Sequence, residues 1–336
     1  MMEVAIIGCG RQGDRRAAAL KEAGDKLSLA VDIVPQLAKN LAGKYGCRYS
    51  TEWKAAVQDN GIDAVLICTS NDSHAEISIA ALKAGKNVLC EKPLARNPKE
   101  ASEILSALKS SKAKLKCGFN HRYHPAIAMA KSHVESGAIG RIMFMRCRYG
   151  ITGREGYEKD WRANAAISGG GQLMDQGQHA IDLFRWFGGE ISEVTGHVDT
   201  MFWKIKPVED NAFAILHGKA GHTCMMHVSW TEWKNLFSFE VFGDKGYVKV
   251  EGLGGSYGKE RLFTGKRDLS GPFNEKATEF SGSDISWEEE WKDFSNSIKR
   301  NKKPLGSADD GAAAVKIAYS IYKSSATGKS VKLGSF

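Results

Sequence analysis

The stretch Gly8-Cys9-Gly10-Arg11-Gln12-Gly13 directly follows the apolar run 4–7 and leads into an alanine-rich stretch predicted to be helical. A second apolar run, 27–31, ends in an acid, Asp32, 22 residues after Gly10. In a strand–turn–helix–strand unit, the first glycine permits the tight turn, the second lets the backbone approach a pyrophosphate, and the third lets helix and strand pack closely. The free N–H groups at the start of such a helix attract phosphates. The pattern predicts a dinucleotide site; the alternative is an ordinary strand–helix turn.

The acid at the end of the second strand bears on the choice of cofactor. The carboxylate of Asp32 suits a free ribose 2′-hydroxyl and repels a 2′-phosphate. No arginine follows it within residues 33–36 to pair with such a phosphate. The sequence therefore predicts NAD rather than NADP.

Strands and helices alternate through residue 118. The run 63–68 is continuously apolar after Asp63, as expected for a strand that is covered on both faces. Repeated strand–helix units imply right-handed crossovers and a doubly wound parallel sheet, that is, an α/β domain. Further strands are predicted at 47–49, 87–90 and 114–118, and helices at 37–44, 75–84 and 99–110.

The pattern changes near residue 121, where we divide the chain into domains of residues 1–120 and 121–336. After one predicted helix over 125–135, apolar and polar residues alternate in short runs joined by Gly- or Asn-containing turns, which is typical of an antiparallel sheet. Strands are predicted at 142–149, 193–201, 212–216, 222–230, 236–242 and 247–250, loops at 252–258 and 264–284, and closing helices at 287–299 and 308–325.

Length and composition narrow the functional classes. A chain of 336 residues favours two domains. Its net charge of +8 is densest at 299–303, next to a predicted helix end, and the aromatic residues show no nucleic-acid pattern, so we expect anionic small molecules as ligands. Seven scattered cysteines favour a reducing cytoplasm, and the sequence predicts no metal site, signal peptide or membrane span.

Polar residues follow the predicted parallel strands, where ligands of open sheets bind. Thr69, Asn71 and His74 come after one strand, Glu91-Lys92-Pro93 after the next, and Asn120 and Arg122 after the sixth. Charges directly after a buried strand are costly unless they face a ligand site, although a surface turn that starts the next helix is the alternative. Pro93 makes a rigid turn, compatible with a cis peptide bond, that fixes where Lys92 points.

A second concentration of polar residues lies in a helix predicted over 172–187. Asp175 and His179 are one turn apart on one face of that helix, with Asp182 as a competitor on another face. A carboxylate beside an imidazole raises its basicity and orients it for general acid–base work. An ordinary buried Asp–His pair is the alternative, and Gln178 is an equally plausible lining residue.

Other features carry weaker signals. Trp161 and Arg162 end a glycine-bearing loop and are candidates to cover a nicotinamide or a substrate. The aromatic residues of the later strands favour core or subunit interface. Because those strands are apolar on both faces, we predict a homodimer or homotetramer built through the second sheet.

Four motifs in this order, residues 8–13, Glu91-Lys92-Pro93, 118–125 and 169–182, resemble the glucose–fructose oxidoreductase, inositol dehydrogenase and rhizopine-catabolism (Gfo/Idh/MocA) family over essentially the whole chain. The resemblance implies a Rossmann domain plus an α+β domain with a large, mostly antiparallel sheet. It also implies NAD-dependent interconversion of an alcohol and a ketone on a sugar, cyclitol or sugar derivative, including nucleotide sugars. Gln176, Gln178 and His121 depart from the residues commonly found in relatives.

The resemblance implies roles for particular residues. His179 would exchange a proton with a sugar hydroxyl, Lys92 would hydrogen-bond the same oxygen, and Asp175 would orient the pair. Two alternatives remain: a glycosidase- or epimerase-like relative that oxidises its substrate transiently, and a non-catalytic NAD-sensing regulator, against which the intact Lys92, Asp175 and His179 argue.

The candidate residues form three overlapping groups. The catalytic candidates are Lys92, Asp175 and His179. The cofactor-binding candidates are Gly8, Gly10, Arg11, Gln12, Gly13, Asp32, Thr69, Asn71, His74, Glu91, Lys92, Pro93, Asn120, Trp161 and Arg162. The substrate-binding candidates are Lys92, Asn120, Arg122, Arg162, Gln172, Asp175, Gln178 and His179.

Overall fold

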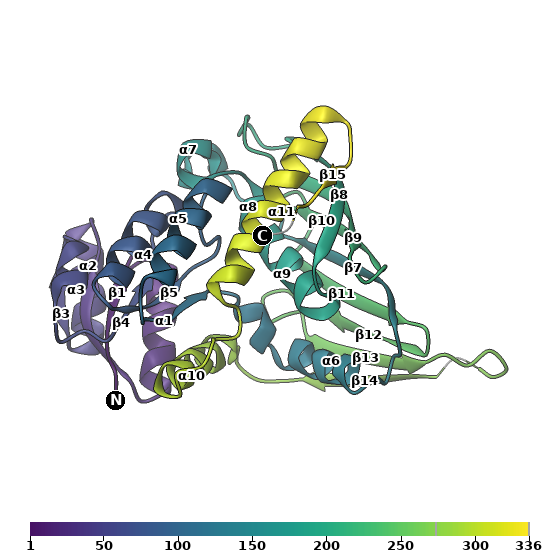
Figure 1. The fold of residues 1–336 in the computed structure, drawn as a ribbon, viewed down its shortest axis with the longest axis horizontal. Coiled ribbons are helices and arrows are strands. Elements are labelled where there is room, and N and C mark those ends of the chain that lie inside the picture. Colours follow the sequence, from purple (N-terminus) through teal and green to yellow (C-terminus); the bar gives the residue numbers. More distant parts are fainter. Residues whose placement is uncertain (273, 335–336) are drawn as a thin grey trace. The chain divides into compact units, whose positions relative to one another are not determined.

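The computed structural model describes all residues except 273 and 335–336, and the chain forms two compact units (Figure 1). Unit 1 consists of Met1–Asn120, Ala166–Gly169 and Trp287–Val315. Unit 2 consists of His121–Ala165, Gly170–Ser286 and the segment from Lys316 onward. The predicted division assigns all of 121–336 to the second domain, whereas the packing groups Trp287–Val315 with the N-terminal sheet.

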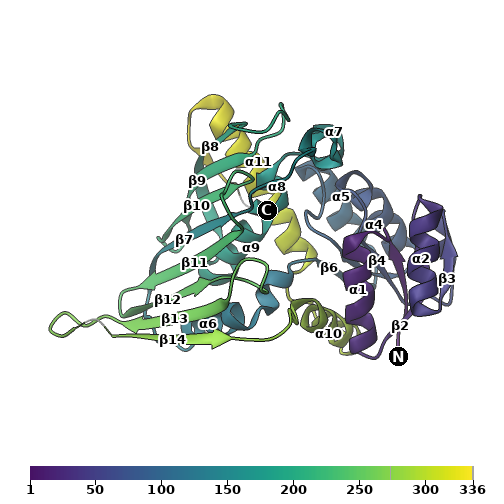
Figure 2. The same cartoon turned by 180° about the vertical axis from the view of Figure 1, so that it is seen from behind.

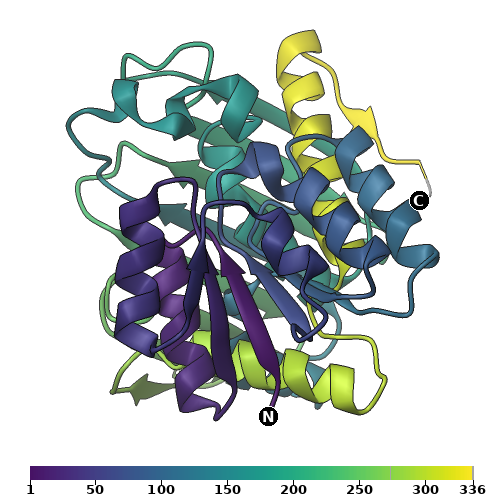
Figure 3. The same ribbon diagram turned by 90° about the vertical axis from the view of Figure 1, so that its left-hand side faces the viewer.

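Unit 1 is a doubly wound α/β unit, as predicted. Its six strands are all parallel, in the order β3-β2-β1-β4-β5-β6, with helices on both faces of the sheet (Figure 3). The strands are β1 (Glu3–Ile7), β2 (Lys26–Val31), β3 (Arg48–Ser50), β4 (Ala64–Ile67), β5 (Asn87–Cys90) and β6 (Leu115–Cys117). The helices include α1 (Arg11–Glu22), α2 (Pro35–Tyr45), α3 (Lys54–Gln58), α4 (His74–Lys83), α5 (Pro98–Lys109) and α10 (Ser286–Lys299), besides the short helix η1 (Asn71–Ser73).

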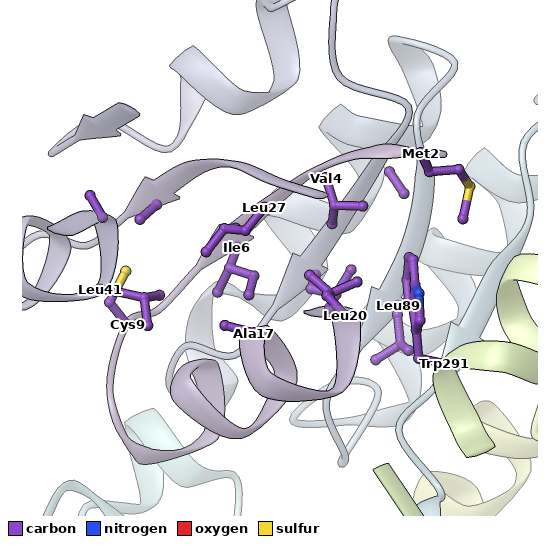
Figure 4. Packing of buried hydrophobic residues seen from close by; sticks show 14 of the residues in the cluster. Met2, Val4, Ile6, Cys9, Ala17, Leu20, Leu27, Leu41, Leu89 and Trp291 are labelled. Carbon is purple, nitrogen blue, oxygen red and sulfur yellow. The ribbon is translucent and has the colours of Figure 1, made fainter. Parts of the chain in front are cut away.

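The core of unit 1 extends to the late helix α10. Trp291 and Phe294 of α10 pack with Met2, Leu20 and Leu89 in one buried cluster, part of which is drawn in Figure 4. Both aromatic side chains are almost fully buried, which contributes about 1.5–3 kcal/mol for a side chain of the size of phenylalanine. A segment almost 300 residues from the N-terminus therefore completes the nucleotide-binding fold.

Unit 2 is built on a nine-stranded sheet in the order β14-β13-β12-β11-β7-β10-β9-β8-β15, and most of its strands can be followed in Figure 2. Neighbouring strands are antiparallel except β7 and β10, which run parallel. The strands are β7 (Ile142–Gly150), β8 (Ile191–Asp199), β9 (Asn211–Gly218), β10 (Thr223–Ser229), β11 (Leu236–Gly243), β12 (Gly246–Glu251), β13 (Glu260–Lys266), β14 (Glu275–Phe280) and β15 (Val331–Lys332). The helices of this part include α6 (Pro125–Glu135). The division of the chain into two units falls within α7 (Ala165–Ser168) and within α11 (Ala308–Thr327).

Two local predictions were wrong. The segment 264–284 was predicted to be loop, but it contains β14 and the end of β13, and these two strands pair antiparallel. The pattern was missed because β14 is an edge strand with mostly exposed, charged side chains, which is how edge strands avoid further pairing. The predicted helix 172–187 is divided into α8 (Gln172–Asp175) and α9 (Gly177–Gly188). At the junction, the N–H of His179 donates to the carbonyl of Gln176 over only three residues, at 3.0 Å, which tightens the turn.

Candidate active site

The glycine loop of unit 1 has the shape that a pyrophosphate needs. Gly8 has φ +97°, and a Cβ there would lie 2.5 Å from the carbonyl carbon of Cys68. A Cβ on Gly13 would overlap the carbonyl oxygen of Gly8, whereas no described atom lies within 4 Å of the Cβ position of Gly10. The backbone at Gly10 can therefore be approached closely, just where α1 begins and where no described side chain caps the helix. Exposed Arg11 and half-exposed Gln12 occupy its first turn.

Asp32 lies beside this loop, at the end of β2. Its Oδ2 accepts a hydrogen bond of 2.7 Å from the N–H of Cys9, and its Oδ1 accepts one of 2.9 Å from the N–H of Val34. These bonds join the acid to the glycine loop and hold it in one orientation. The cradle and the acid fit the pyrophosphate and the adenosine ribose of NAD.

Lys92 follows β5 directly and is half-buried, and the Lys92–Pro93 peptide bond is cis. The buried ring of His74 lies between two carbonyl oxygens, with Nδ1 2.8 Å from that of Pro93 and Nε2 3.2 Å from that of Thr69. Burial lowers the pKa of His74, so the neutral ring is favoured. His74 therefore packs between the turns after β4 and β5, and the single N–H of the neutral ring donates to the backbone of one of them.

Two further candidates after β4 also hold backbone in place. The buried amide of Asn71 donates to the carbonyl of Ser168 at 2.7 Å, and Oγ1 of Thr69 accepts from Ser73 at 2.6 Å. The Asn71 bond ties the segment Ala166–Gly169 to the end of the parallel sheet, and the Thr69 bond closes the turn after β4. Asn120, at the start of the short helix η2 (Asn120–Tyr123), is also buried.

In unit 2, the buried carboxylate of Glu209 fixes the start of α8. It accepts hydrogen bonds from the N–H groups of Gly171 and Leu173, at 2.9 and 3.0 Å, and from the hydroxyl of Tyr322, at 2.8 Å. Burial raises the pKa of Glu209, while the hydrogen bonds act in the opposite direction. A Cβ on Gly171 would overlap the carbonyl oxygen of Glu209, so a glycine is required there.

His179 lies on α9 and is only 4% exposed. Its ring stacks on that of His121, with centroids 3.7 Å apart and an interplanar angle of 14°. Nε2 of His121 is 3.0 Å from the hydroxyl of Tyr149, whose pKa is raised well above its usual value by burial. Half-buried Asp175 has Oδ2 3.7 Å from Nε of Arg162. The unit therefore holds the imidazole in a packed set of rings and places a guanidinium near the acid.

The glutamines of this segment make contacts with other residues of unit 2 instead of lining an open site. Gln172 is fully buried and donates to Gln176 and, at 2.9 Å, to the carbonyl of Ser229. Gln176 donates to the hydroxyl of Tyr257 at 2.7 Å. Gln178 is fully buried, with its amide nitrogen 3.6 Å from the sulfur of Met174.

Arg122 and Asp182 form a buried ion pair in unit 2. Nε and Nη2 of Arg122 donate to the two oxygens of Asp182 at 2.8 and 2.5 Å. Asp182, the competing acid of this segment, is thus the partner of Arg122, and both are candidates for a structural role. Arg162 lies over the ring of Trp161, 4.3 Å from its centroid.

Sequence reasoning missed three residues around these candidates: Tyr149, Tyr257 and Glu209. Tyr149 belongs to the inward-facing set of β7, which the alternation of that strand could have indicated. Tyr257 lies in the glycine-rich segment 252–258, predicted only as a loop, and Glu209 precedes a strand without any local pattern.

Two negative findings concern the described residues. Within residues 1–272 and 274–334, no group of three His, Cys, Asp or Glu side chains is placed to hold a metal ion. None of the helices in this part of the chain is long and apolar enough to cross a membrane.

Comparison with known proteins identifies both halves of the chain. Residues 2–119 match the model of the oxidoreductase family with an NAD-binding Rossmann fold, and residues 127–249 match that of the GFO/IDH/MocA C-terminal domain. The chain belongs to the Gfo/Idh/MocA family. The predicted family and fold are thereby confirmed, as is an NAD-binding domain.

Individual members of the family resemble the chain to different extents. A levoglucosan dehydrogenase of Pseudarthrobacter phenanthrenivorans is 40% identical over 169 residues, which span 49% of this chain but only 43% of that relative. A myo-inositol 2-dehydrogenase of Thermotoga maritima is 29% identical over 99% of this chain and 98% of its own. A solved structure of levoglucosan dehydrogenase in complex with NADH superimposes with a TM-score of 0.93 at 25% identity, covering all of both chains.

Proposed function

We propose that this protein is an NAD(H)-dependent oxidoreductase that interconverts a secondary alcohol and a ketone on a sugar, cyclitol or sugar derivative. The observation that carries the proposal is the glycine cradle with Asp32 beside it, in a chain that also holds Asp175 and His179 on one buried segment. The cradle would hold the pyrophosphate and Asp32 the ribose hydroxyls, and NAD, when bound, supplies a hydride acceptor. The names of the relatives, levoglucosan and inositol dehydrogenases, support this substrate class.

We assign the proton transfer to His179, which accepts the hydroxyl proton in oxidation and returns it in reduction. The ring can do so only in one orientation, and the stack on His121 supports that orientation. Lys92 donates a hydrogen bond to the reacting oxygen and stabilises its alkoxide character. Asp175 orients the imidazole and balances its charge.

The substrate-facing candidates differ in how accessible they are. Arg122, Gln172 and Gln178 are buried and make the internal contacts described above, whereas Trp161, Arg162 and Asp175 are partly exposed. Side chains able to hydrogen-bond suit a polyhydroxylated ligand, and an aliphatic ketone would leave them unpaired. Arg162 and the net charge of +8 are compatible with a phosphate or nucleotide attached to the sugar.

The test is a screen for NADH formation from NAD, and for NADH consumption, followed at 340 nm. The panel contains levoglucosan, myo-inositol, other sugars and cyclitols, the ketones that correspond to them, sugar phosphates and nucleotide sugars. Turnover is expected with a polyhydroxylated compound. Tight NAD binding with no turnover on any member of the panel would contradict the proposed activity and favour a sensing role.

We also propose that the protein is a homo-oligomer built through the nine-stranded sheet. One face of the sheet carries exposed apolar side chains in register: Ile215 and Met225 are direct cross-strand partners and are 45% and 51% exposed. Phe213 on the same strand is also exposed, and Phe144 stacks on Phe242 at 4.7 Å on that face. A patch of this kind favours a second copy in closed symmetry, a dimer or tetramer.

Light scattering at micromolar concentration tests the assembly. The mass should be two or four times the 36.7 kDa of one chain, and Met225→Arg should shift it toward the monomer. A monomeric mass for the unmodified protein would refute the assembly.

Cysteines buried in apolar strands, such as Cys90 and Cys147, support a reducing compartment, for which we propose the cytoplasm.

A further inference from the structure

Lys92 lies between two residues whose positions are fixed by buried contacts. On one side, Glu91 accepts a hydrogen bond of 2.8 Å from Nε of Arg16 and forms an ion pair with this guanidinium, whose Nη2 lies 2.7 Å from the same carboxylate oxygen. On the other side, the carbonyl of Pro93 contacts the ring of His74, as described above. The lysine therefore projects from a backbone that is held at both neighbours.

The first of these anchors depends on a residue from the far end of the chain. Nη1 of Arg16 donates to Glu290 of α10 at 2.6 Å, so the guanidinium bridges two carboxylates. Arg16 and Glu290 are both almost completely buried, and the ring of Trp287 lies 4.6 Å from the guanidinium carbon. Nζ of Lys116 is a second cation near Glu290, at 3.8 Å.

Packing leaves this cluster little freedom. A Cβ on Gly118 would lie 2.9 Å from Nη2 of Arg16 and 3.0 Å from Oε2 of Glu91, so the ion pair fills the space beside β6. Arg16 itself lies one turn after Gly13 on the helix that opens at the glycine loop. The cluster thus connects the start of the cofactor cradle, the turn that carries Lys92 and helix α10, all within unit 1.

We propose that Glu290 is a positioning residue for Lys92, acting through Arg16 and Glu91. Charge-assisted hydrogen bonds fix Arg16 between the two carboxylates, and Arg16 in turn fixes the residue that precedes Lys92. Removing the charge of Glu290 leaves Arg16 held from one side, which lets Glu91 and the backbone of Lys92 move. A misplacement of about 1 Å can lower a rate by up to about 100-fold. The inference rests on the proposed function, because it presumes that Lys92 acts on the substrate.

The experiment combines Glu290→Gln with Lys92→Met and measures single-turnover NADH formation, using the carbohydrate that the screen identifies. Glu290→Gln should lower the rate roughly 10- to 100-fold in the unmodified protein but less than about twofold in the Lys92→Met background. NADH affinity, followed by fluorescence, should stay nearly unchanged in both. Glu289→Gln removes the same charge from the exposed face of the same helix and should change neither quantity.

Each other outcome overturns one specific statement. An equal rate loss in both backgrounds, or a loss that follows weakened NADH binding, means that Glu290 acts on the fold and not through Lys92. A Lys92→Met protein with normal turnover overturns the role assigned to Lys92, and the inference with it, whereas the proposed function is tested separately by the substrate screen. If Glu290→Gln does not fold, Arg16→Lys is the second variant, because lysine keeps the charge but cannot span both carboxylates. Its rate loss must likewise vanish in the Lys92→Met background, and a loss that persists there overturns the inference.

Discussion

The turn of Lys92 in unit 1 and the helices of Asp175 and His179 in unit 2 are held by different kinds of contact. The Lys92 turn relies on charge, with Arg16 buried between Glu91 and Glu290. The other segment relies on one carboxylate, Glu209, which accepts from two backbone N–H groups and a tyrosine, and on stacked rings. A buried ion pair fixes geometry but is costly to break, whereas stacking tolerates a change of charge.

This difference predicts different sensitivities. Neutralising a single charge should disturb the Lys92 turn through several residues, as tested above for Glu290. In unit 2, a change of ring shape at His121 should matter more than a change of charge. The predictions below test the two regions in order of expected effect.

The largest effect is expected at the proton-transfer residue itself. His179→Asn keeps a polar side chain but removes the imidazole, and it should lower turnover by roughly 10²–10⁴ while NAD affinity stays nearly intact. Lys92→Met should do at least similar damage, because a donor and a positive charge are lost together. Rates and NADH titrations on the identified substrate test both, with chemistry first shown to be rate-limiting. Near-normal turnover of the His179 variant under that condition would contradict the assigned mechanism.

Unit 2 has its own buried ion pair, and it provides a comparison with the Arg16 cluster. Arg122 and Asp182 are 3% and 0% exposed, so Arg122→Ala leaves an uncompensated buried charge. The free energy of unfolding should fall by about 3–5 kcal/mol, measured by urea denaturation. The exposed pair Lys44–Asp14 is the control, and Lys44→Ala should lower the free energy of unfolding far less, because water screens this pair. Equal losses for the two variants would show that burial does not set the cost here.

The third effect concerns the cofactor cradle of unit 1. Asp32 would stand about 4 Å from a 2′-phosphate, and two like charges at that distance repel by about 4 kcal/mol at an effective dielectric constant of 20. Calorimetry should therefore show NAD bound nearly a thousandfold more tightly than NADP. Asp32→Asn should reduce this preference, mostly by improving NADP binding. Equal affinities for the two cofactors in the unmodified protein would sink the assignment.

The sequence predicts well whatever local patterns determine. The continuous apolar run of β4 and the glycine loop before α1 identify the parallel sheet, because both signals lie within a few residues. The alternation in β9 likewise identifies a half-exposed strand. β14 lacks such a pattern, since a charged edge strand buries almost nothing.

Long-range partners are what the sequence cannot provide. Glu290 reaches Arg16 across 274 residues, and Glu209 reaches Gly171 across 38 residues. Neither contact leaves a periodic signal, because any acid on a buried helix face or before a strand looks the same locally. The same holds for Arg122, whose ion pair with Asp182, 60 residues along the chain, has no signal in the local sequence.

The smallest predicted effect is on the pH dependence of stability, and it compares one buried histidine from each unit. His74 is the single histidine of unit 1 among the described residues, and burial lowers its pKa in the folded state below the ordinary 6.5. Below that pH the unfolded chain binds a proton at this position that the folded chain does not, so stability falls as the pH falls. The slope from one such group is at most about 1.4 kcal/mol per pH unit.

His74→Gln should make stability decline less steeply as the pH falls below 6.5, measured as the midpoints of urea denaturation at a series of pH values. His222 of unit 2, whose pKa burial also lowers, is the matched control: His222→Gln should remove its own share of the slope and leave the turn of Lys92 intact. If His74→Gln leaves the slope unchanged, the pKa of His74 does not differ between the folded and the unfolded chain, and the prediction is wrong.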